Sequence, residues 1–418
     1  MQKWMLTLAC LLAAGTARGE NWPQWRGAGN DGISHETDLP EKWSKTENVA
    51  WRLPLPGAAG ATPVVWDDAI FVTSATPSGD LLLLCVGTDG IERWRRKVTG
   101  GDRAVRGDEG NSASPSPVTD GEHVWAFFAN GTLACFDFEG KEVWREELPK
   151  RYGAFNIAFG LTSTPVLDGD RLYLQLLHTG AALVVALDKE TGKEVWKQTR
   201  QSDARDECEH SYASPVIYRD NEHEFLLTHG CDYVVAHSLE DGHELWRCGG
   251  LNPKGKYNNT LRFVASPVVA PGLIVVPSAK DGPVLGLRPD SRGDISNSPK
   301  GHRWVRPKNT PDVPSPLVVD GLVYLCRENG VLICMDADSG KELYSERAFS
   351  DRYRASPVYA DGKIYLTARG GMVTVVKAGP DFEILASNDI QEPISSSPAI
   401  SGGRIYLRSF EALYAIGK

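Results

Sequence analysis

A Ser/Thr-Pro pair followed by an aliphatic run recurs eight times along this chain and restricts its fold more than any other feature. Successive prolines are separated by 54, 48, 50, 52, 49, 41 and 41 residues. Repeats of about 40 to 50 residues are typical of propeller blades, which bury their flat faces only by stacking on neighbours. The eight prolines are Pro63, Pro117, Pro165, Pro215, Pro267, Pro316, Pro357 and Pro398.

Each repeat follows one pattern of short apolar runs and tight turns, shown most fully by TPVLDGDRLYLQLLHTGAALVVALDKETGKEVWKQ from Thr164. Strand A follows the proline, and an Asp-Gly turn leads to strand B. A loop leads to strand C, and Thr-Gly-Lys turns into strand D, which ends near Trp196. Asp-Gly and similar turns between apolar runs are strong hairpin signals. Four short antiparallel strands per repeat predict one propeller blade.

The two ends of the chain predict how the ring closes. The eighth repeat, SPAISGGRIYLRSFEALYAIGK, stops after its third strand. The segment NVAWRLPL, Asn48 to Leu55, fits the missing fourth strand and places Trp51 where other repeats have their final aromatic residue. Pairing the termini removes an exposed sheet edge. We therefore expect an all-β fold, an eight-bladed propeller over residues 48–418 closed by an N-terminal strand.

The first residues have the pattern of an export signal. Lys3 gives a short positive region, Leu6–Ala14 is apolar, and Ala17-Arg18-Gly19 offers small residues for cleavage. We expect a signal peptide over residues 1–19, then an N-terminal extension over 20–47. No later segment has the length and apolarity of a transmembrane helix. The expected location is the periplasm or the exterior of the cell.

Charge and motifs exclude several function classes. The net charge of -9 and the pI near 5.6 disfavour nucleic acid as a partner, because nucleic-acid binding proteins usually present a basic surface. The chain has no G-x-S-x-G, no H-E-x-x-H and no phosphate-binding glycine loop. Its glycines are spaced as hairpin turns. The sequence therefore offers no catalytic residues by motif.

One repeat segment also carries a family resemblance. ALDKETGKEVW, Ala186 to Trp196, resembles the tryptophan-docking repeat of quinoprotein dehydrogenases. The exported form of the chain resembles the bacterial PQQ-like repeat proteins related to the outer-membrane assembly lipoprotein BamB. NWPQWRG and LPEKWSKTENVAWRLPLPG near the N-terminus are similar to exported PQQ-like propellers of about this size. The resemblance implies the fold and says little about function, because one fold hosts many activities.

The hallmarks of a quinone enzyme are missing from the sequence. Quinoprotein alcohol dehydrogenases carry a vicinal cysteine pair beside the quinone, and this chain has no Cys-Cys. Their calcium-holding Glu, Asn and Asp residues have no identifiable counterparts here, and no C-x-x-C-H haem motif is present. We therefore expect no cofactor, with PQQ plus calcium as the alternative.

The cysteines divide into two groups. Cys85, Cys135 and Cys334 take the small-residue position of the docking repeat, and we interpret them, with Cys326, as buried small side chains. Disulfide pairing among Cys208, Cys231 and Cys248 stays open, since export permits disulfides. Two nitrogens and two sulfurs near blade four form a weak candidate site for zinc or copper. Its residues are Cys208, His210, His229 and Cys231.

Topology places the variable loops on one face. The A–B and C–D hairpins share one face of the ring, while the B–C and D–A loops share the other, here called the loop face. Several arginines gather there, and a cationic mouth would attract an anionic ligand; ordinary loop polarity explains the same residues. The candidate ligand-binding residues are Arg106, Glu109, Asn111, Asn156, His178, His210, Tyr212, His229, Arg262, Lys280, Arg327, Arg354 and Arg369.

Two functions remain open at this point. The first is a non-catalytic exported scaffold, expected to be a monomer, that binds an envelope protein, a peptide or a glycan through the loop face. The second is a PQQ-dependent oxidoreductase, or another enzyme, that acts at the mouth of the central channel.

Overall fold

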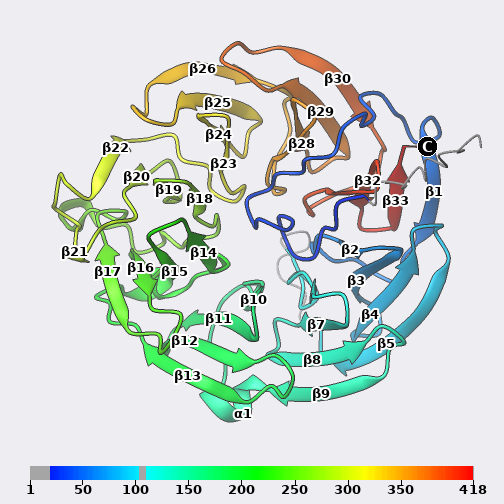
Figure 1. Ribbon diagram of the computed structural model, residues 1–418, viewed down its shortest axis with the longest axis horizontal. Helices are drawn as coiled ribbons and strands as arrows, with labels where there is room; N and C mark the ends of the chain where they lie inside the picture. The colour runs from blue at the N-terminus through cyan, green and yellow to red at the C-terminus, as the bar shows by residue number, and fades with distance from the viewer. Residues whose placement is uncertain (1–18, 103–109, 418) are drawn as a thin grey trace, which may run out of the picture.

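The computed structural model describes residues 19–102 and 110–417, and these form an eight-bladed all-β propeller (Figure 1). Every blade is a four-stranded antiparallel sheet, and blade 4 gains a short fifth strand, β21 (Gly293–Asp294), which pairs parallel to its outer strand. The predicted fold is confirmed. The signal peptide predicted over residues 1–19 lies outside the described residues, apart from Gly19.

The strands follow the predicted A-B-C-D order from the channel outward. Blade 1 has β2 (Val64–Trp66), β3 (Ala69–Ala75), β4 (Asp80–Gly87) and β5 (Glu92–Gly100); blade 2 has β6 (Val118–Thr119), β7 (His123–Phe127), β8 (Thr132–Asp137) and β9 (Glu142–Glu147); blade 3 has β10 (Val166–Asp168), β11 (Arg171–His178), β12 (Ala181–Asp188) and β13 (Glu194–Thr199); blade 4 has β14 (Val216–Arg219), β15 (Glu224–Gly230), β16 (Tyr233–His237) and β17 (Glu244–Cys248).

Blade 5 has β18 (Val268–Ala270), β19 (Leu273–Pro277), β20 (Val284–Leu287) and β22 (His302–Arg306); blade 6 has β23 (Leu317–Val319), β24 (Leu322–Cys326), β25 (Val331–Asp336) and β26 (Glu342–Arg347); blade 7 has β27 (Val358–Ala360), β28 (Lys363–Thr367), β29 (Met372–Lys377) and β30 (Ile384–Asp389); blade 8 has β31 (Ala399–Ser401), β32 (Arg404–Arg408), β33 (Ala412–Ile416) and β1 (Val49–Pro54). The described helices are short: α1 (Leu148–Tyr152), η1 (Asp206–Glu209) and η2 (Lys254–Lys256). Within the described ranges, no helix has the length and apolarity to cross a membrane.

The N-terminal strand closes the ring as predicted. β1 pairs antiparallel with β33, with Trp51 opposite Ala415. The buried carboxylate of Glu392 joins this seam, because its Oε1 accepts hydrogen bonds from Arg52 Nη2 at 2.8 Å and from Tyr414 Oη at 2.6 Å. Strand pairing and a buried polar network therefore hold the last blade together.

Docked aromatic residues explain the small residue that faces them in seven of the eight blades, while blade 7 pairs Val375 with Ala386 instead. Trp94 pairs across the ladder with Cys85, and Trp144 pairs with Cys135. In blade 5 the partner of Trp304 is Gly286, where a Cβ would lie 2.3 Å from the indole. A small side chain leaves room for the ring to lie flat against the sheet. Cys85, Cys135, Cys326 and Cys334 are all buried and free, which confirms their interpretation as small core residues.

The same indoles bind the following blade. Trp144 Nε1 donates to Lys189 O at 2.9 Å, and its ring covers Gly192 in the next C–D turn. That glycine has φ = 67°, and a Cβ would meet the ring at 2.7 Å. Trp51, Trp94, Trp196 and Trp304 make the corresponding hydrogen bonds to Thr88, Phe138, Leu239 and Ala337. The indole of the outer strand therefore helps to fix the outer part of each of these five junctions.

A ring of hydrogen bonds joins the blades around the channel. The backbone N–H of the residue before each proline donates to the hydroxyl of the equivalent residue in the next blade, at 2.9–3.1 Å in seven of the eight junctions. Among the described residues, the junction from Ser397 to Thr62 lacks this bond. The ring residues are Thr62, Ser116, Thr164, Ser214, Ser266, Ser315, Ser356 and Ser397. This ring explains why the repeats place Ser or Thr before proline.

The N-terminal extension lies across the channel (Figure 1). Its contacts with the A–B turns of blades 1 and 8 place it on the face opposite the loop face. Trp22 forms a β-bridge with Val65 of blade 1, and farther along Ile33 bridges to Tyr359 of blade 7. Between them the buried Arg26 donates from Nη2 to Pro316 O of blade 6 at 2.8 Å. Burial lowers the pKa of this guanidinium to about 10, so it stays charged at neutral pH. The extension therefore ties blade 1 to blades 6 and 7, which are not adjacent to it in the ring.

Replacing Gly192 with alanine is expected to destabilise the protein by about 2–4 kcal/mol, because a Cβ there strains the backbone and overlaps Trp144. Gly169→Ala is the matched control. Gly169 also has positive φ, 59°, but no atom lies within 4 Å of its Cβ position, so about 1–2 kcal/mol is expected. Urea unfolding of both variants measures the difference. Equal losses of stability in the two variants would contradict a close contact between Gly192 and the Trp144 ring.

Candidate functional site

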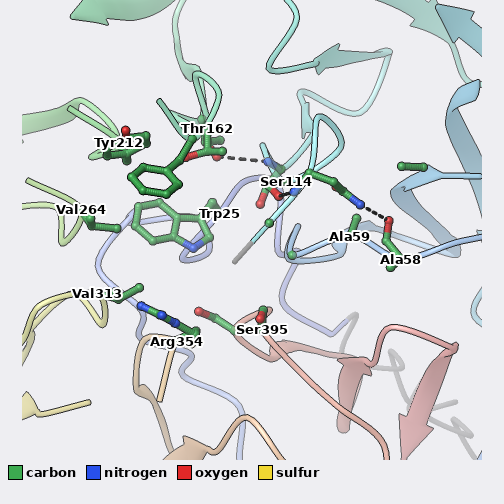
Figure 2. Close-up of a pocket in the computed structure, with 18 of the residues that line it drawn as sticks. Trp25, Ala58, Ala59, Ser114, Thr162, Tyr212, Val264, Val313, Arg354 and Ser395 are labelled. Carbon is green, nitrogen blue, oxygen red and sulfur yellow. Dashed lines mark hydrogen bonds between the residues drawn. The ribbon is translucent and has the colours of Figure 1, made fainter. Parts of the chain in front are cut away.

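A cavity of about 660 Å³ opens at the loop-face end of the channel (Figure 2). D–A loops of all eight blades line it, because each loop approaches the axis just before its proline. Cavities of 300–1,000 Å³ are typical of small-molecule sites. The ring hydroxyls of Ser116, Thr164, Ser214, Ser266, Ser315, Ser356 and Ser397 form part of its wall.

Trp25 of the N-terminal extension contributes the largest flat surface of the cavity. Figure 2 shows its ring among Tyr212, Val264, Val313 and Arg354, which come from loops of blades 4 to 7. The side chain is only partly buried. Its neighbour Arg26 is the residue anchored to blade 6, so the position of the indole is fixed by the extension.

Aromatic rings continue along one side of the wall. Phe159 and Tyr212 meet edge-on with centroids 5.9 Å apart, and the Arg262 guanidinium lies 4.7 Å above the Phe159 ring. Burial raises the pKa of Tyr212, which stays a neutral phenol at neutral pH. On the other side Phe410 also lines the cavity. The wall therefore alternates apolar rings with hydroxyl groups.

The arginines around the mouth are compensated by acidic residues. Arg262 Nη1 lies 3.7 Å from Glu207 Oε1, and Arg354 Nη1 lies 3.2 Å from Glu328 Oε1. Farther out, Arg327 pairs with an aspartate, Asp281, at 2.9 Å. A carboxylate beside each cation cancels most of its field at the cavity. This pairing does not favour the anionic ligand suggested by the sequence.

The structure brings four of the predicted ligand-binding residues to the cavity wall: Asn111, Tyr212, Arg262 and Arg354. Seven others lie outside the wall: Asn156, His178, His210, His229, Lys280, Arg327 and Arg369. Arg106 and Glu109 lie outside the described residues. Sequence reasoning missed Trp25, Phe159 and the ring hydroxyls. The Ser or Thr before each proline was the available signal for the hydroxyls, whereas nothing in the sequence placed Trp25 in the channel.

The predicted histidines are packing residues beside the cavity. His178 and His210 are buried, and burial lowers the pKa of each. His210 Nε2 lies 3.0 Å from Thr179 Oγ1, which connects the loops of blades 3 and 4. His229 is fully buried against Phe263, with ring centroids 4.6 Å apart, and burial lowers its pKa to about 3. All three are neutral at pH 7.

The cysteines near blade 4 form neither a disulfide nor a metal site in the described residues. Cys208, Cys231 and Cys248 are free and buried. Cys208 Sγ donates to Asn258 O, and Cys231 Sγ donates to Glu209 O, so each thiol has its own partner. The ligand atoms proposed from Cys208, His210, His229 and Cys231 do not meet.

The only metal-type cluster in the described part of the chain lies elsewhere, on the hairpin face. It consists of Asp120, His123 and Glu190. Lys189 Nζ lies 2.7 Å from Asp120 Oδ2 and 3.8 Å from Glu190 Oε1. An ammonium group therefore already occupies the cation position between these carboxylates.

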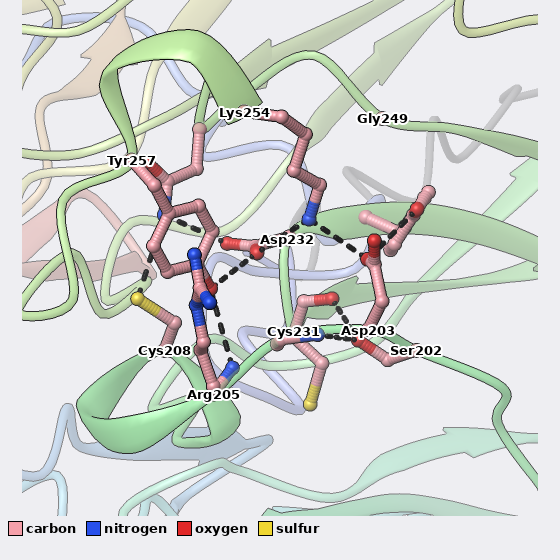
Figure 3. A network of polar contacts seen from close by, with 12 residues as sticks. Ser202, Asp203, Arg205, Cys208, Cys231, Asp232, Gly249, Lys254 and Tyr257 are labelled. Carbon is pink, nitrogen blue, oxygen red and sulfur yellow. Dashed lines mark hydrogen bonds and ion pairs between the residues drawn. The ribbon is translucent and has the colours of Figure 1, made fainter.

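A buried carboxylate positions the loop that carries Arg262 (Figure 3). Asp232 accepts hydrogen bonds from Asn252 Nδ2 at 3.1 Å and Tyr257 Oη at 2.7 Å, and Lys254 Nζ lies 3.3 Å away. The three partners lie in the loop between β17 and β18, while Asp232 lies in the B–C loop of blade 4. A buried charge is stable only when paired and hydrogen-bonded. The network therefore fixes this part of the cavity wall.

Stability is expected to fall as the pH drops from about 6.5 toward 3. His229 and His237 have folded-state pKa values of about 3, well below the unfolded value, so the unfolded chain binds more protons in this window. Each of these two histidines lowers the free energy of unfolding by about 2 kcal/mol at pH 5. His229→Phe should flatten the dependence, because it removes one of these two protonation sites. Urea midpoints between pH 4 and 8 test this, and an unchanged slope in His229→Phe would contradict it.

Comparison with known proteins agrees with this architecture. BamB from Moraxella catarrhalis superposes with a TM-score of 0.62 at 13% identity, covering 88% of this chain and 97% of that one. The quinohemoprotein alcohol dehydrogenase of Comamonas testosteroni gives 0.68 at 13% identity, over 95% and 81%. A europium-containing methanol dehydrogenase gives 0.70 at 12% identity, over 94% and 90%. At these identities the likeness shows the fold alone.

No curated protein matches the chain at a significant level. The family model described as outer membrane protein assembly factor BamB matches residues 42–174 and 129–378, which span most of the propeller. The chain therefore belongs to the BamB family of PQQ-like β-propellers.

Proposed function

We propose that this protein is a non-catalytic scaffold of the bacterial envelope, periplasmic or secreted, that binds a partner through its loop face. The cavity at the mouth of the channel carries this proposal. It opens among loops from all eight blades, which are held by hydrogen bonds at both the inner and the outer radius. A rigid ring with a receptive mouth suits binding, because little ordering is needed when the partner arrives.

The chemistry of the cavity wall supports binding over catalysis. The described lining contains hydroxyls, aromatic rings, small residues and two arginines in ion pairs. A general acid–base pair or an activated nucleophile needs a side chain with a suitable base in hydrogen-bond reach. The buried histidines lie outside the wall. The family description names an outer membrane protein assembly factor, which supports a partner in the envelope.

A PQQ-dependent oxidoreductase is the second candidate, because one structural neighbour is a quinohemoprotein alcohol dehydrogenase and another is a methanol dehydrogenase. The described cavity does not fit that cofactor with calcium. Calcium takes six to eight oxygen ligands, several of them carboxylates. Asp102 supplies the single carboxylate of the described wall, and its Oδ1 already accepts the Ser112 N–H at 2.8 Å. We therefore propose a function without this cofactor.

Filling the mouth is expected to abolish partner binding. Val313 lines the cavity, so Val313→Arg places a long charged side chain in it. Val195→Arg is the matched control, because Val195 is exposed on the outer strand β13. Pull-down from envelope extract with quantitative mass spectrometry should show at least about a tenfold loss of the specific partner for Val313→Arg only. Equal capture by both variants would exclude the mouth as the binding surface.

Titration with PQQ and calcium separates the two candidates. We expect neither a saturable change in melting temperature nor a shift of the quinone absorbance, because the described wall lacks the carboxylates that calcium requires. The soluble quinone with calcium but without protein is the reference. Saturable shifts in both signals, with reduction of an artificial electron acceptor, would establish the enzyme instead.

A further inference from the structure

The ring hydroxyls have a donor that the protein does not use. Seven of them accept a backbone N–H from the preceding blade. A hydroxyl also donates one hydrogen bond, but the hydrogen bonds of the described residues include these seven hydroxyls only as acceptors. The wall thus presents O–H donors around the whole channel. Acceptors for them therefore lie outside the described residues, and a ligand rich in oxygen atoms could supply them.

Trp25 adds a flat apolar face to this polar wall. Its ring is partly exposed in the cavity, beside the aliphatic side chains of Val264 and Val313 (Figure 2). Aromatic faces bind flat C–H surfaces well, through large contact area at low entropic cost. A ligand that fits both features has a ring with apolar faces and oxygen atoms around its edge. Pyranose sugars have this construction.

The polar groups at the mouth fit an uncharged ligand. Arg262 is paired with Glu207, and Arg354 is paired with Glu328. Arg262 and Arg354 line the cavity, whereas Glu207 and Glu328 lie outside its wall, so each arginine offers N–H donors whose charge is balanced from behind. The oxygen of a neutral sugar hydroxyl can accept a hydrogen bond from such a guanidinium, and the ligand needs no charge of its own. An anionic ligand would gain little from these arginines, because the neighbouring carboxylates cancel most of their field.

A peptide fits the wall less well. Peptide recognition usually uses a free strand edge, a hydrophobic groove for a helix, or a charged pocket for a terminus. Here the backbone N–H groups before the prolines already donate to ring hydroxyls. The wall offers side-chain hydroxyls in place of a free backbone edge.

We propose that the cavity binds a neutral sugar ring, the terminal pyranose of a glycan, stacked on Trp25 with its hydroxyls facing the Ser/Thr ring and the guanidinium groups of Arg262 and Arg354. This inference rests on the proposed function and names the class of ligand that enters the mouth. Trp25 acts as the stacking surface, supplied by a segment outside the repeats.

Saturation-transfer NMR on the full chain tests the proposal, with maltotriose, cellotriose and triacetylchitotriose as neutral probes. Trigalacturonate and trialanine are the acidic and peptide probes, all at millimolar concentration. At least one neutral trisaccharide should bind. Trp25→Ala should weaken its affinity at least about tenfold and Trp25→Phe about threefold or less. Phe349→Ala is the matched control, because Phe349 is an exposed aromatic residue on the loop between β26 and β27, outside the wall.

A second variant guards against misfolding of Trp25→Ala. Ser315→Thr keeps the ring hydroxyl, and threonine already occupies the equivalent position at Thr164, so the variant is expected to melt like the parent. Its extra methyl group changes the wall and should weaken the same trisaccharide at least about threefold.

Each outcome of the probe-binding experiment either supports or overturns the glycan proposal. Binding of trialanine in place of the neutral sugars would overturn the glycan and keep the loop-face scaffold, as would preference for trigalacturonate. Binding of no probe would also overturn the glycan. The scaffold itself fails separately, if Val313→Arg leaves partner capture unchanged.

Discussion

The hydrogen bond from the backbone N–H before each proline to a hydroxyl of the next blade is the interaction on which the centre of this molecule depends. Proline has no N–H and holds the preceding residue extended, so strand A starts with its chain aimed along the channel. The preceding N–H would be buried without a partner near the axis. The neighbouring Ser or Thr satisfies it, as Ser266 does for Ser214 at 2.9 Å. The same bond sets the spacing of the blades and the shape of the cavity wall.

These contacts connect only neighbouring blades, so the seam between the last and the first blade needs other means. The Ser397 to Thr62 junction lacks the ring hydrogen bond among the described residues. Arg408 of blade 8 is fully buried there, and its guanidinium donates to Thr73 O of blade 1 at 2.9 Å and to Gly57 O at 3.2 Å. Burial lowers the pKa of Arg408 to about 9. Strand β1 therefore closes the ring at its outer edge, and the buried Arg408 joins blades 8 and 1 nearer the channel.

The repeat pattern predicted the architecture because its signals are local and recur in every blade. The proline positions, the Asp-Gly turns and the aromatic residue at the end of strand D each follow from short-range geometry. Trp51 in the closing strand makes the same kind of indole hydrogen bond as Trp196 in blade 3. The cysteines at Cys85 and Cys135 were predictable for the same reason. Because the same turn and strand signals occur in every blade, the fold can be recognised from a single sequence.

The cavity was predicted only in part, because its chemistry depends on contacts between loops that do not repeat. The sequence placed Arg262 and Arg354 on the loop face, as the structure does. Their neutralisation by Glu207 and Glu328 arises from loop conformations that no pattern reveals. Trp25 reaches the channel because Arg26 anchors an extension with no regular secondary structure. These contacts join loops that are far apart in the chain, so local sequence patterns do not predict them.

The most direct measurement is a crystal structure of the protein with the neutral trisaccharide that binds most tightly in solution. The account predicts a sugar ring in the channel mouth, stacked on Trp25, with oxygens in hydrogen-bond distance of ring hydroxyls such as Ser315 and Ser356. A sugar bound on the outer surface, with only solvent in the cavity, would contradict it.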